Sequence, residues 1–184
     1  MKLNHLDCIF ESKLCTRQAF FHQMTYTNYK TLDNLKEKIK KNVGHSHNTH
    51  VKAGMTDWRL FNEDQDFSEV VNAFLKNIAY HNLVFFKNKN LKDFKIAIKD
   101  SWGISYSKGD ETVRHAHEGS MYSTCLYFSN DTSLYTDCKK FSTHKGLLLT
   151  CPGWVEHWVP KKKTDEQTYV LVFNWDIINE WEKN

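Results

Sequence analysis

The sequence has little proline and no long apolar run, and both features restrict its architecture. Only 2 of its 184 residues are proline, so a proline-rich linker or a low-complexity tail is excluded. Its longest apolar runs, such as Leu83–Phe86 and Val170–Phe173, have about four residues, whereas a membrane-spanning helix needs about 20. We therefore expect no membrane partner. Because the opening stretch MKLNHLDCIF has no apolar signal-peptide core, we also expect a cytoplasmic protein.

Paired cysteines and a large excess of one charge are missing as well. The five cysteines contain no CxxC pair and their number is odd, which indicates reduced thiols rather than a disulfide framework. The formal net charge is only +3, from 25 Lys and Arg against 22 Asp and Glu. This balance disfavours a nucleic-acid partner without excluding one. The motifs GxSxG, GxGxxG, HExxH and the P-loop are also absent.

Helical spacing is found mainly in the first half of the chain. Apolar residues recur at this spacing over residues 31–42 and 68–80, with Thr31 and Ser68 as the expected N-caps. A last short helix is expected over residues 177–182. Between the first two helices, the stretch GHSHNTHVKAG is typical of a polar loop.

After about residue 83 the apolar positions alternate with polar ones, which predicts strands. The predicted strands are 94–99, 102–106, 113–117, 123–128, 133–135, 146–151, 156–159 and 168–175, with a further one over 6–10. Helices followed by short strands predict a mainly β (α+β) fold, namely a double-stranded β-helix or jelly roll with the helices packed on one face. We expect one domain over 1–184, in which 1–90 is an N-terminal extension and 91–176 is the jelly-roll core.

Three histidines stand where a jelly roll would bring them together. His115 and His117 are two apart in a predicted strand, so both side chains lie on one face. His157 follows the Pro152–Gly153 turn, 40 residues after His117, and the two segments meet at the mouth of such a barrel. Three imidazoles leave about three open positions on an octahedral metal for O₂ and a chelating substrate. Zinc also suits three histidines, so the spacing leaves the metal open.

The residues around this histidine pair distinguish it from a second HxH in the chain. His45 and His47, with His50 nearby, lie in the polar loop and are typical of a surface. The stretch GDETVRHAH, in contrast, resembles the cupin signature of a glycine, five residues and then HxH. The stretch GLLLTCPGWVEH resembles the later part of that signature, which ends in a histidine. The acidic ligand of cupins is absent, since Met121 and Tyr122 stand in its place.

A wider resemblance is to the Fe(II)/2-oxoglutarate dioxygenases, especially small phage and bacterial oxygenases with a prolyl-hydroxylase-like double-stranded β-helix. It covers roughly residues 53–175 and rests on the order and spacing of AGMTDWRLF, SWGISYSKGDETVRHAHEGSMYSTCLYF, KGLLLTCPGWVEHWVP and TYVLVFNW. The resemblance implies Fe(II), 2-oxoglutarate and O₂. It also implies His115, His117 and His157 as metal ligands, and Tyr106 and Tyr127 in the cosubstrate pocket.

Two positions depart from that family. His117 stands in place of the usual aspartate, and the loss of a negative charge makes the iron site more positive. Thr168 stands where the family has the arginine that pairs with the distal carboxylate of 2-oxoglutarate, and no arginine follows Arg114. Either a lysine takes over this role or the cosubstrate is another compound. The candidate lysines are Lys139, Lys140 and Lys161–Lys163.

Aromatic residues near the histidines are the candidates for substrate contacts. Trp154 and Trp158 flank His157, where core packing accounts for them equally well. Tyr122 falls near the expected place of the substrate. We expect a small molecule or a peptide as substrate, and the sequence leaves its identity and the oligomeric state open.

The sequence leaves three functions open. The first is a 2-oxoglutarate-dependent oxygenase, and the second is a three-histidine cupin-type dioxygenase whose substrate itself chelates the iron. The third is a non-catalytic jelly-roll binding module. The many Lys and Asn residues, together with the family resemblance, suggest a phage gene, whose product would act in the host cytoplasm.

Overall fold

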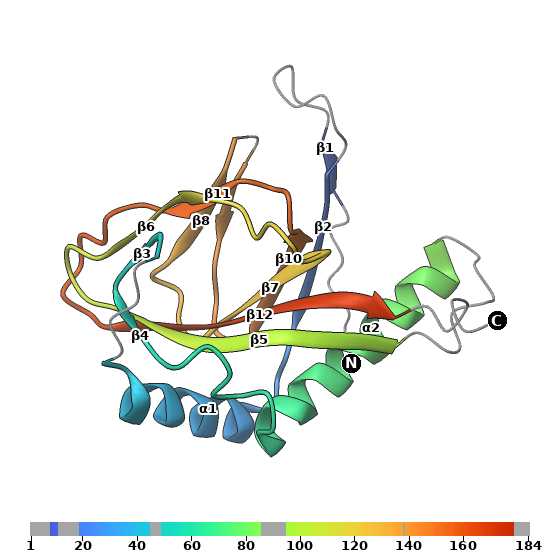
Figure 1. Ribbon diagram of the computed structural model, residues 1–184, viewed down its shortest axis with the longest axis horizontal. Helices are drawn as coiled ribbons and strands as arrows, with labels where there is room; N and C mark the ends of the chain where they lie inside the picture. The colour runs from blue at the N-terminus through green and yellow to red at the C-terminus, as the bar shows by residue number, and fades with distance from the viewer. Residues whose placement is uncertain (1–7, 11–18, 45–48, 86–94, 138, 179–184) are drawn as a thin grey trace.

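The computed structural model describes residues 8–10, 19–44, 49–85, 95–137 and 139–178, which form two antiparallel sheets and two helices (Figure 1). The larger sheet contains, in spatial order, β1 (Cys8–Phe10), β2 (Ala19–Thr25), β10 (Leu147–Pro152), β7 (Tyr122–Tyr127), β12 (Thr168–Ile178), β5 (Lys95–Tyr106) and β4 (Gly54–Met55). The smaller sheet contains β3 (Val51–Lys52), β6 (Glu111–His115), β11 (His157–Val159), β8 (Ser133–Thr136) and β9 (Lys140–Ser142). Figure 1 shows the smaller sheet above the larger one and both helices beneath the larger one.

Strand β12 shows how the larger sheet separates two cores. Val170 and Val172 belong to the core between the sheets, whereas Leu171 and Phe173 belong to the core between the larger sheet and the helices. All four are buried. A strand that is covered on both faces needs apolar side chains at successive positions, which explains the unbroken run in TYVLVFNW. The predicted mainly β fold with helices on one face is confirmed.

Helix α1 (Tyr29–Asn42) begins two residues before the predicted start, and its cap is Asn28 rather than Thr31. The Asn28 side chain accepts a hydrogen bond from the backbone N–H of Thr31 at 3.4 Å. The Thr31 hydroxyl instead donates to the carboxylate of Glu69 at 3.1 Å, which links the two helices. The predicted cap was wrong because the Thr31 hydroxyl is hydrogen-bonded to Glu69 of the other helix and not to its own helix.

Replacing Asn28 with alanine should lower the free energy of unfolding by about 1 kcal/mol, the usual cost of losing an N-cap side chain. The variant loses the bond to Thr31 and also the bond that Asn28 donates to Glu69 at 2.8 Å. Chemical denaturation monitored by circular dichroism measures the difference. The neighbouring exposed Thr27 offers the matched control, since Thr27→Ala should change stability by less than about 0.5 kcal/mol. Equal stabilities of the two variants would contradict the capping role.

Helix α2 (Gln65–Phe85) also begins before its predicted start, because the capping side chain is Asp64 and not Ser68. The Asp64 carboxylate accepts from the backbone N–H of Phe67 at 3.0 Å. Ser68 lies inside the first turn and its hydroxyl donates to the Asp64 carbonyl oxygen at 2.9 Å. Phe67 is buried and its ring meets Phe173 edge-on at a centroid distance of 5.3 Å, so it anchors the start of the helix to the larger sheet.

Several strand boundaries differ from the predictions. The two strands expected over 94–99 and 102–106 are one strand, β5, which pairs with β12 along almost its whole length. Ile177 and Ile178 extend β12 instead of beginning a helix, and the rest of that predicted helix lies outside the described residues. Strands β2 and β9 were not predicted, and β3 and β4 occupy part of the expected polar loop. Within the described ranges, no helix is long and apolar enough to cross a membrane.

Candidate metal centre

The pairing of two short strands brings the three histidines together. Strand β6 pairs antiparallel with β11, and their register places His115 directly opposite His157. His117 lies just beyond the end of β6, so the prediction that both histidines share a strand was wrong. The backbone N–H of His117 donates to the Gly153 carbonyl at 2.8 Å, in the turn before β11. This bond holds the loop with His117 against the other two histidines.

The three imidazoles form a compact group whose candidate ligand atoms all lie within 4.8 Å of one another. Ring centroids are 4.6 Å apart for His115 and His157, 5.0 Å for His115 and His117, and 5.1 Å for His117 and His157. The Nδ1 atoms of two of them face backbone carbonyls at 2.9 Å, His115 facing Val113 and His157 facing Val155. An Nδ1–H that donates to a carbonyl leaves Nε2 free to bind a metal.

The surroundings keep these side chains neutral. Burial, followed by repulsion from the other histidines, lowers the pKa of His117 to about 2. Burial likewise lowers the pKa of His157 to about 4, with a smaller contribution from His115. The pKa of His115 is also lowered by burial. A neutral imidazole is the form that binds a metal ion, so the set fits a divalent cation at neutral pH.

His50 lies next to this group, which its place in a polar loop did not indicate. Its ring stacks on His115 at a centroid distance of 5.3 Å and an interplanar angle of 12°. Its carbonyl oxygen accepts from the backbone N–H of Val113 at 2.8 Å, which ties the segment before β3 to β6. His50 itself is exposed, as expected of a loop residue.

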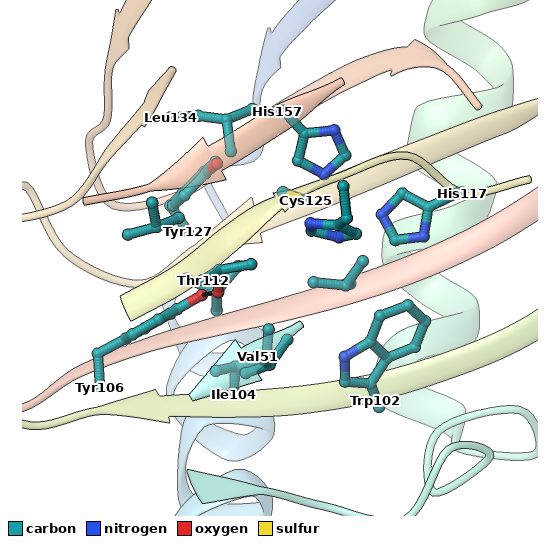
Figure 2. A pocket seen from close by; sticks show the side chains of 14 residues that line it. Val51, Trp102, Ile104, Tyr106, Thr112, His117, Cys125, Tyr127, Leu134 and His157 are labelled. Atoms are coloured by element: carbon teal, nitrogen blue, oxygen red, sulfur yellow. Dashed lines mark hydrogen bonds between the residues drawn. The ribbon is translucent and has the colours of Figure 1, made fainter. Parts of the chain in front are cut away.

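The histidines close one end of a cavity between the two sheets. Its volume is about 390 Å³ when the space open to solvent at the mouth is included, within the usual range for small-molecule sites. Figure 2 shows His117 and Trp102 on one side of the cavity and Tyr106 and Tyr127 on the other. Between them the walls are mostly apolar. The wall residues include Val51, Ile104, Leu134, Val159, Val170 and Val172.

The two tyrosines predicted for the cosubstrate pocket both line this cavity. The hydroxyl of Tyr106 shares a hydrogen bond of 2.6 Å with Thr112. The hydroxyl of Tyr127 has no hydrogen-bond partner among the described residues, and the Cys125 thiol beside it is a weak acceptor. Burial raises the pKa of both tyrosines, so they are neutral phenols. Thr168 lies opposite Tyr106 in the sheet and is fully buried, but it is not part of the described lining.

No lysine or arginine belongs to the described lining of the cavity. Lys162 is buried, yet its Nζ donates to the Thr164 hydroxyl at 2.8 Å. Lys139 and Lys140 place their Nζ atoms over the rings of Phe141 and Tyr135. Lys161 and Lys163 are exposed. None of the lysines proposed to replace the missing arginine therefore contacts the cavity in this structure.

The three aromatic residues predicted to contact substrate lie outside the cavity. Trp158 alternates with the buried His157 and faces away from it, where its ring stacks on Tyr135 and lies beneath Arg114. Tyr122 stacks on Trp175 at 4.5 Å, at the core between the larger sheet and the helices. Trp154 is exposed in the turn before His157. A role in substrate binding stays a prediction for all three.

Comparison with solved structures shows the same fold in several oxygenases. A prolyl-4-hydroxylase from Pseudomonas putida superposes with a TM-score of 0.58 and 15% identity, over 84% of this chain and 91% of that one. The chain has the fold of Fe(II)/2-oxoglutarate oxygenases. A viral collagen prolyl hydroxylase from Paramecium bursaria chlorella virus-1, in complex with 2-oxoglutarate, gives a TM-score of 0.58 and 11% identity over 84% and 94%.

A third similar structure of this oxygenase fold holds both a metal and a small molecule. HygX from Streptomyces hygroscopicus, with nickel, 2-oxoglutarate and hygromycin B bound, gives a TM-score of 0.57 and 8% identity over 84% and 82% of the two chains. At these identities the similarity is one of fold. No protein-family model matches the sequence, and no curated protein matches it. The phage origin stays a prediction.

Replacing Gly153 with alanine should lower the affinity for a divalent metal by about 10-fold or more, comparable to the loss of a group that orients a ligand. A Cβ at Gly153 would lie 2.0 Å from the carbonyl oxygen of Ser120 and 2.8 Å from that of His117, so the loop with His117 must move. A Co(II) titration followed by visible absorbance measures the affinity. Gly54→Ala is the matched control, since its nearest neighbour would be 3.6 Å away. Unchanged affinity in Gly153→Ala would contradict the positioning of His117 by this turn.

Proposed function

We propose that this protein is a non-haem Fe(II)-dependent oxygenase whose metal is held by His115, His117 and His157. The observation that carries the proposal is the convergence of three neutral histidines at one end of a cavity, in a fold shared with oxygenases. Three nitrogen ligands leave coordination positions open, and iron in such a site supplies the activation of O₂.

The residues of the chain would divide the remaining tasks. The Nδ1 contacts of His115 and His157 with backbone carbonyls would fix the direction of their rings. The apolar walls would exclude water from the reacting groups. The substrate is expected to be a small molecule or a peptide. HygX, which holds hygromycin B, shows that this fold accepts a small molecule.

The two ends of 2-oxoglutarate do not fit the cavity equally well. Its 2-oxo acid end is a bidentate ligand that would suit the open positions of a metal on the three histidines. Its second carboxylate would reach the tyrosine end, where the described lining offers no cation. An unpaired buried carboxylate costs several kcal/mol. This favours the second candidate function, a three-histidine oxygenase that binds a different chelating compound.

Oxygen consumption by the iron-loaded protein tests the proposed function. Wild-type protein, loaded with Fe(II) under anaerobic conditions, is mixed with O₂, ascorbate and sets of small molecules and peptides. We expect substrate-dependent oxygen uptake that is absent in His115→Ala, because that variant lacks one of the three ligands. Equal uptake by His115→Ala would refute the assignment of the metal site.

A further inference from the structure

We propose that the cavity binds a chelator with a single carboxylate and an uncharged tail whose end accepts a hydrogen bond from Tyr127. The inference rests on the proposed metal site and specifies which compound occupies the cavity beside it. The shared chemistry is that of a 2-oxo acid with one charge. Such a compound is either a cosubstrate or the primary substrate.

The charge of the cavity sets the first requirement. Its middle is walled by valine, leucine and isoleucine side chains, and no lysine or arginine belongs to the described lining. Lys162, which is buried, donates a hydrogen bond from its Nζ to the Thr164 hydroxyl. A carboxylate at the tyrosine end would lose its hydration and gain no cation. The tail of a well-bound ligand is therefore uncharged.

Two buried donors without partners set the second requirement. The Tyr127 side chain is 1% exposed and the Trp102 side chain is 3% exposed. The Tyr127 hydroxyl and the Trp102 indole Nε1 both lack a hydrogen-bond partner among the described residues, although both side chains line the cavity. Buried donors are almost always satisfied, so each is suited to a ligand that brings an acceptor.

The positions of these donors match the two ends of the ligand. Trp102 lies beside His117, with a ring centroid distance of 6.0 Å, so its N–H is available to an acceptor on the histidine side of the cavity. Tyr127 lies on the opposite side of the cavity (Figure 2), where its hydroxyl is suited to a neutral acceptor on the tail. Tyr106 does not compete for this acceptor, because its hydroxyl is already bonded to Thr112.

Three 2-oxo acids distinguish the effect of a charge at the end of the tail from the effect of the tail's shape. 2-Oxoglutarate carries the second carboxylate, 2,5-dioxohexanoate carries an acetyl group in its place, and 2-oxopentanoate ends in a methyl group. Each is titrated anaerobically into the Fe(II)-loaded full chain, and the visible charge-transfer band reports bidentate binding. We expect 2,5-dioxohexanoate to bind at least about 100-fold more tightly than 2-oxoglutarate, because only the latter buries an unpaired charge.

Tyr127→Phe tests the hydroxyl and should fold normally, because the variant removes a buried donor whose only neighbouring acceptor among the described residues is the weak one of the Cys125 thiol. Its affinity for 2,5-dioxohexanoate should fall by about 3- to 10-fold, the worth of one hydrogen bond, and its affinity for 2-oxopentanoate should not change. An equal loss for both compounds would overturn the role of Tyr127 as a donor to the tail.

The other outcomes separate this inference from the proposed function. Tight binding of 2-oxoglutarate would overturn the inference, and loss of that binding in Lys162→Met would identify the cation responsible. If iron binds but none of the three compounds produces the charge-transfer band, the inference is overturned and the proposed iron site is retained. If no iron binds, the proposed function and the inference fail together.

A turnover measurement distinguishes the two possible roles of the chelator, cosubstrate and primary substrate. A cosubstrate is consumed with O₂ when ascorbate supplies two electrons and two protons, and it yields carbon dioxide, water and the acid that is one carbon shorter. A 2-oxo acid that binds but is not decarboxylated acts as an analogue of the primary substrate. Either result supports the class of ligand, provided that the order of affinities holds.

Discussion

Replacing His157 with alanine is expected to lower the affinity for Fe(II) or Co(II) by more than about 100-fold, beyond the range seen when only a ligand's supporting group is lost. His157 is the most buried of the three histidines and lies opposite His115 in the sheet. Its removal leaves two imidazoles, and the replacing methyl group binds no metal. Calorimetric titration of the metal-free protein measures the change.

The matched control for this prediction is His144→Ala. His144 is an exposed histidine whose Nε2 contacts the Thr25 hydroxyl at 2.9 Å, and it is not one of the three clustered histidines. We expect this variant to bind metal as the wild type does. If His144→Ala loses as much affinity as His157→Ala, the metal is not bound by the three clustered histidines.

Replacing Phe173 with alanine is expected to lower the free energy of unfolding by about 3–5 kcal/mol, the usual cost of deleting a fully buried aromatic ring. Phe173 is 0% exposed. Its ring meets Phe67 at 5.3 Å and Phe74 at 5.7 Å, both edge-on, so it joins the larger sheet to helix α2. Denaturation followed by tryptophan fluorescence and by circular dichroism measures the loss.

The same experiment tests whether the chain is one domain. If residues 1–90 and the jelly-roll core unfold together, both signals shift by the same amount in Phe173→Ala. Tyr29→Ala is the control, because Tyr29 is 55% exposed and should contribute less than about 1 kcal/mol through its contact with Lys145. Two separate transitions, only one of which shifts, would contradict a single cooperative unit.

The fold class could be predicted because the spacing of apolar residues distinguishes helices from strands. The ends of the helices and strands could not, because they depend on tertiary partners. The expected break between the two strands near Ser101 does not occur. The buried Ser101 hydroxyl donates to the side chain of Asn62 at 2.5 Å, which lets a polar residue continue the strand. Thr31 is similar, since its hydroxyl bonds to Glu69 and not to its own helix. Neither Asn62 nor Glu69 could be identified as a partner from local sequence.

The candidate site was predictable to a different degree for each residue. The HxH spacing selected His115 and His117, although only the first is in a strand. The register that sets His157 opposite His115 could not be read from the sequence. Trp102 was not singled out as a site residue, because only the folded cavity shows that its N–H has no hydrogen-bond partner among the described residues. The outward position of Trp158 follows from strand alternation with His157, a signal that the sequence did contain.

An anaerobic titration with Fe(II), followed by addition of nitric oxide as a mimic of O₂, tests the central claim most directly. We predict that the wild-type chain binds one Fe(II) and that nitric oxide then produces the half-integer-spin paramagnetic resonance signal of an iron nitrosyl, because three histidines leave positions open. The signal should be absent in His157→Ala. Failure to bind iron, or an iron site that nitric oxide cannot reach, would contradict an oxygenase centre at these three histidines.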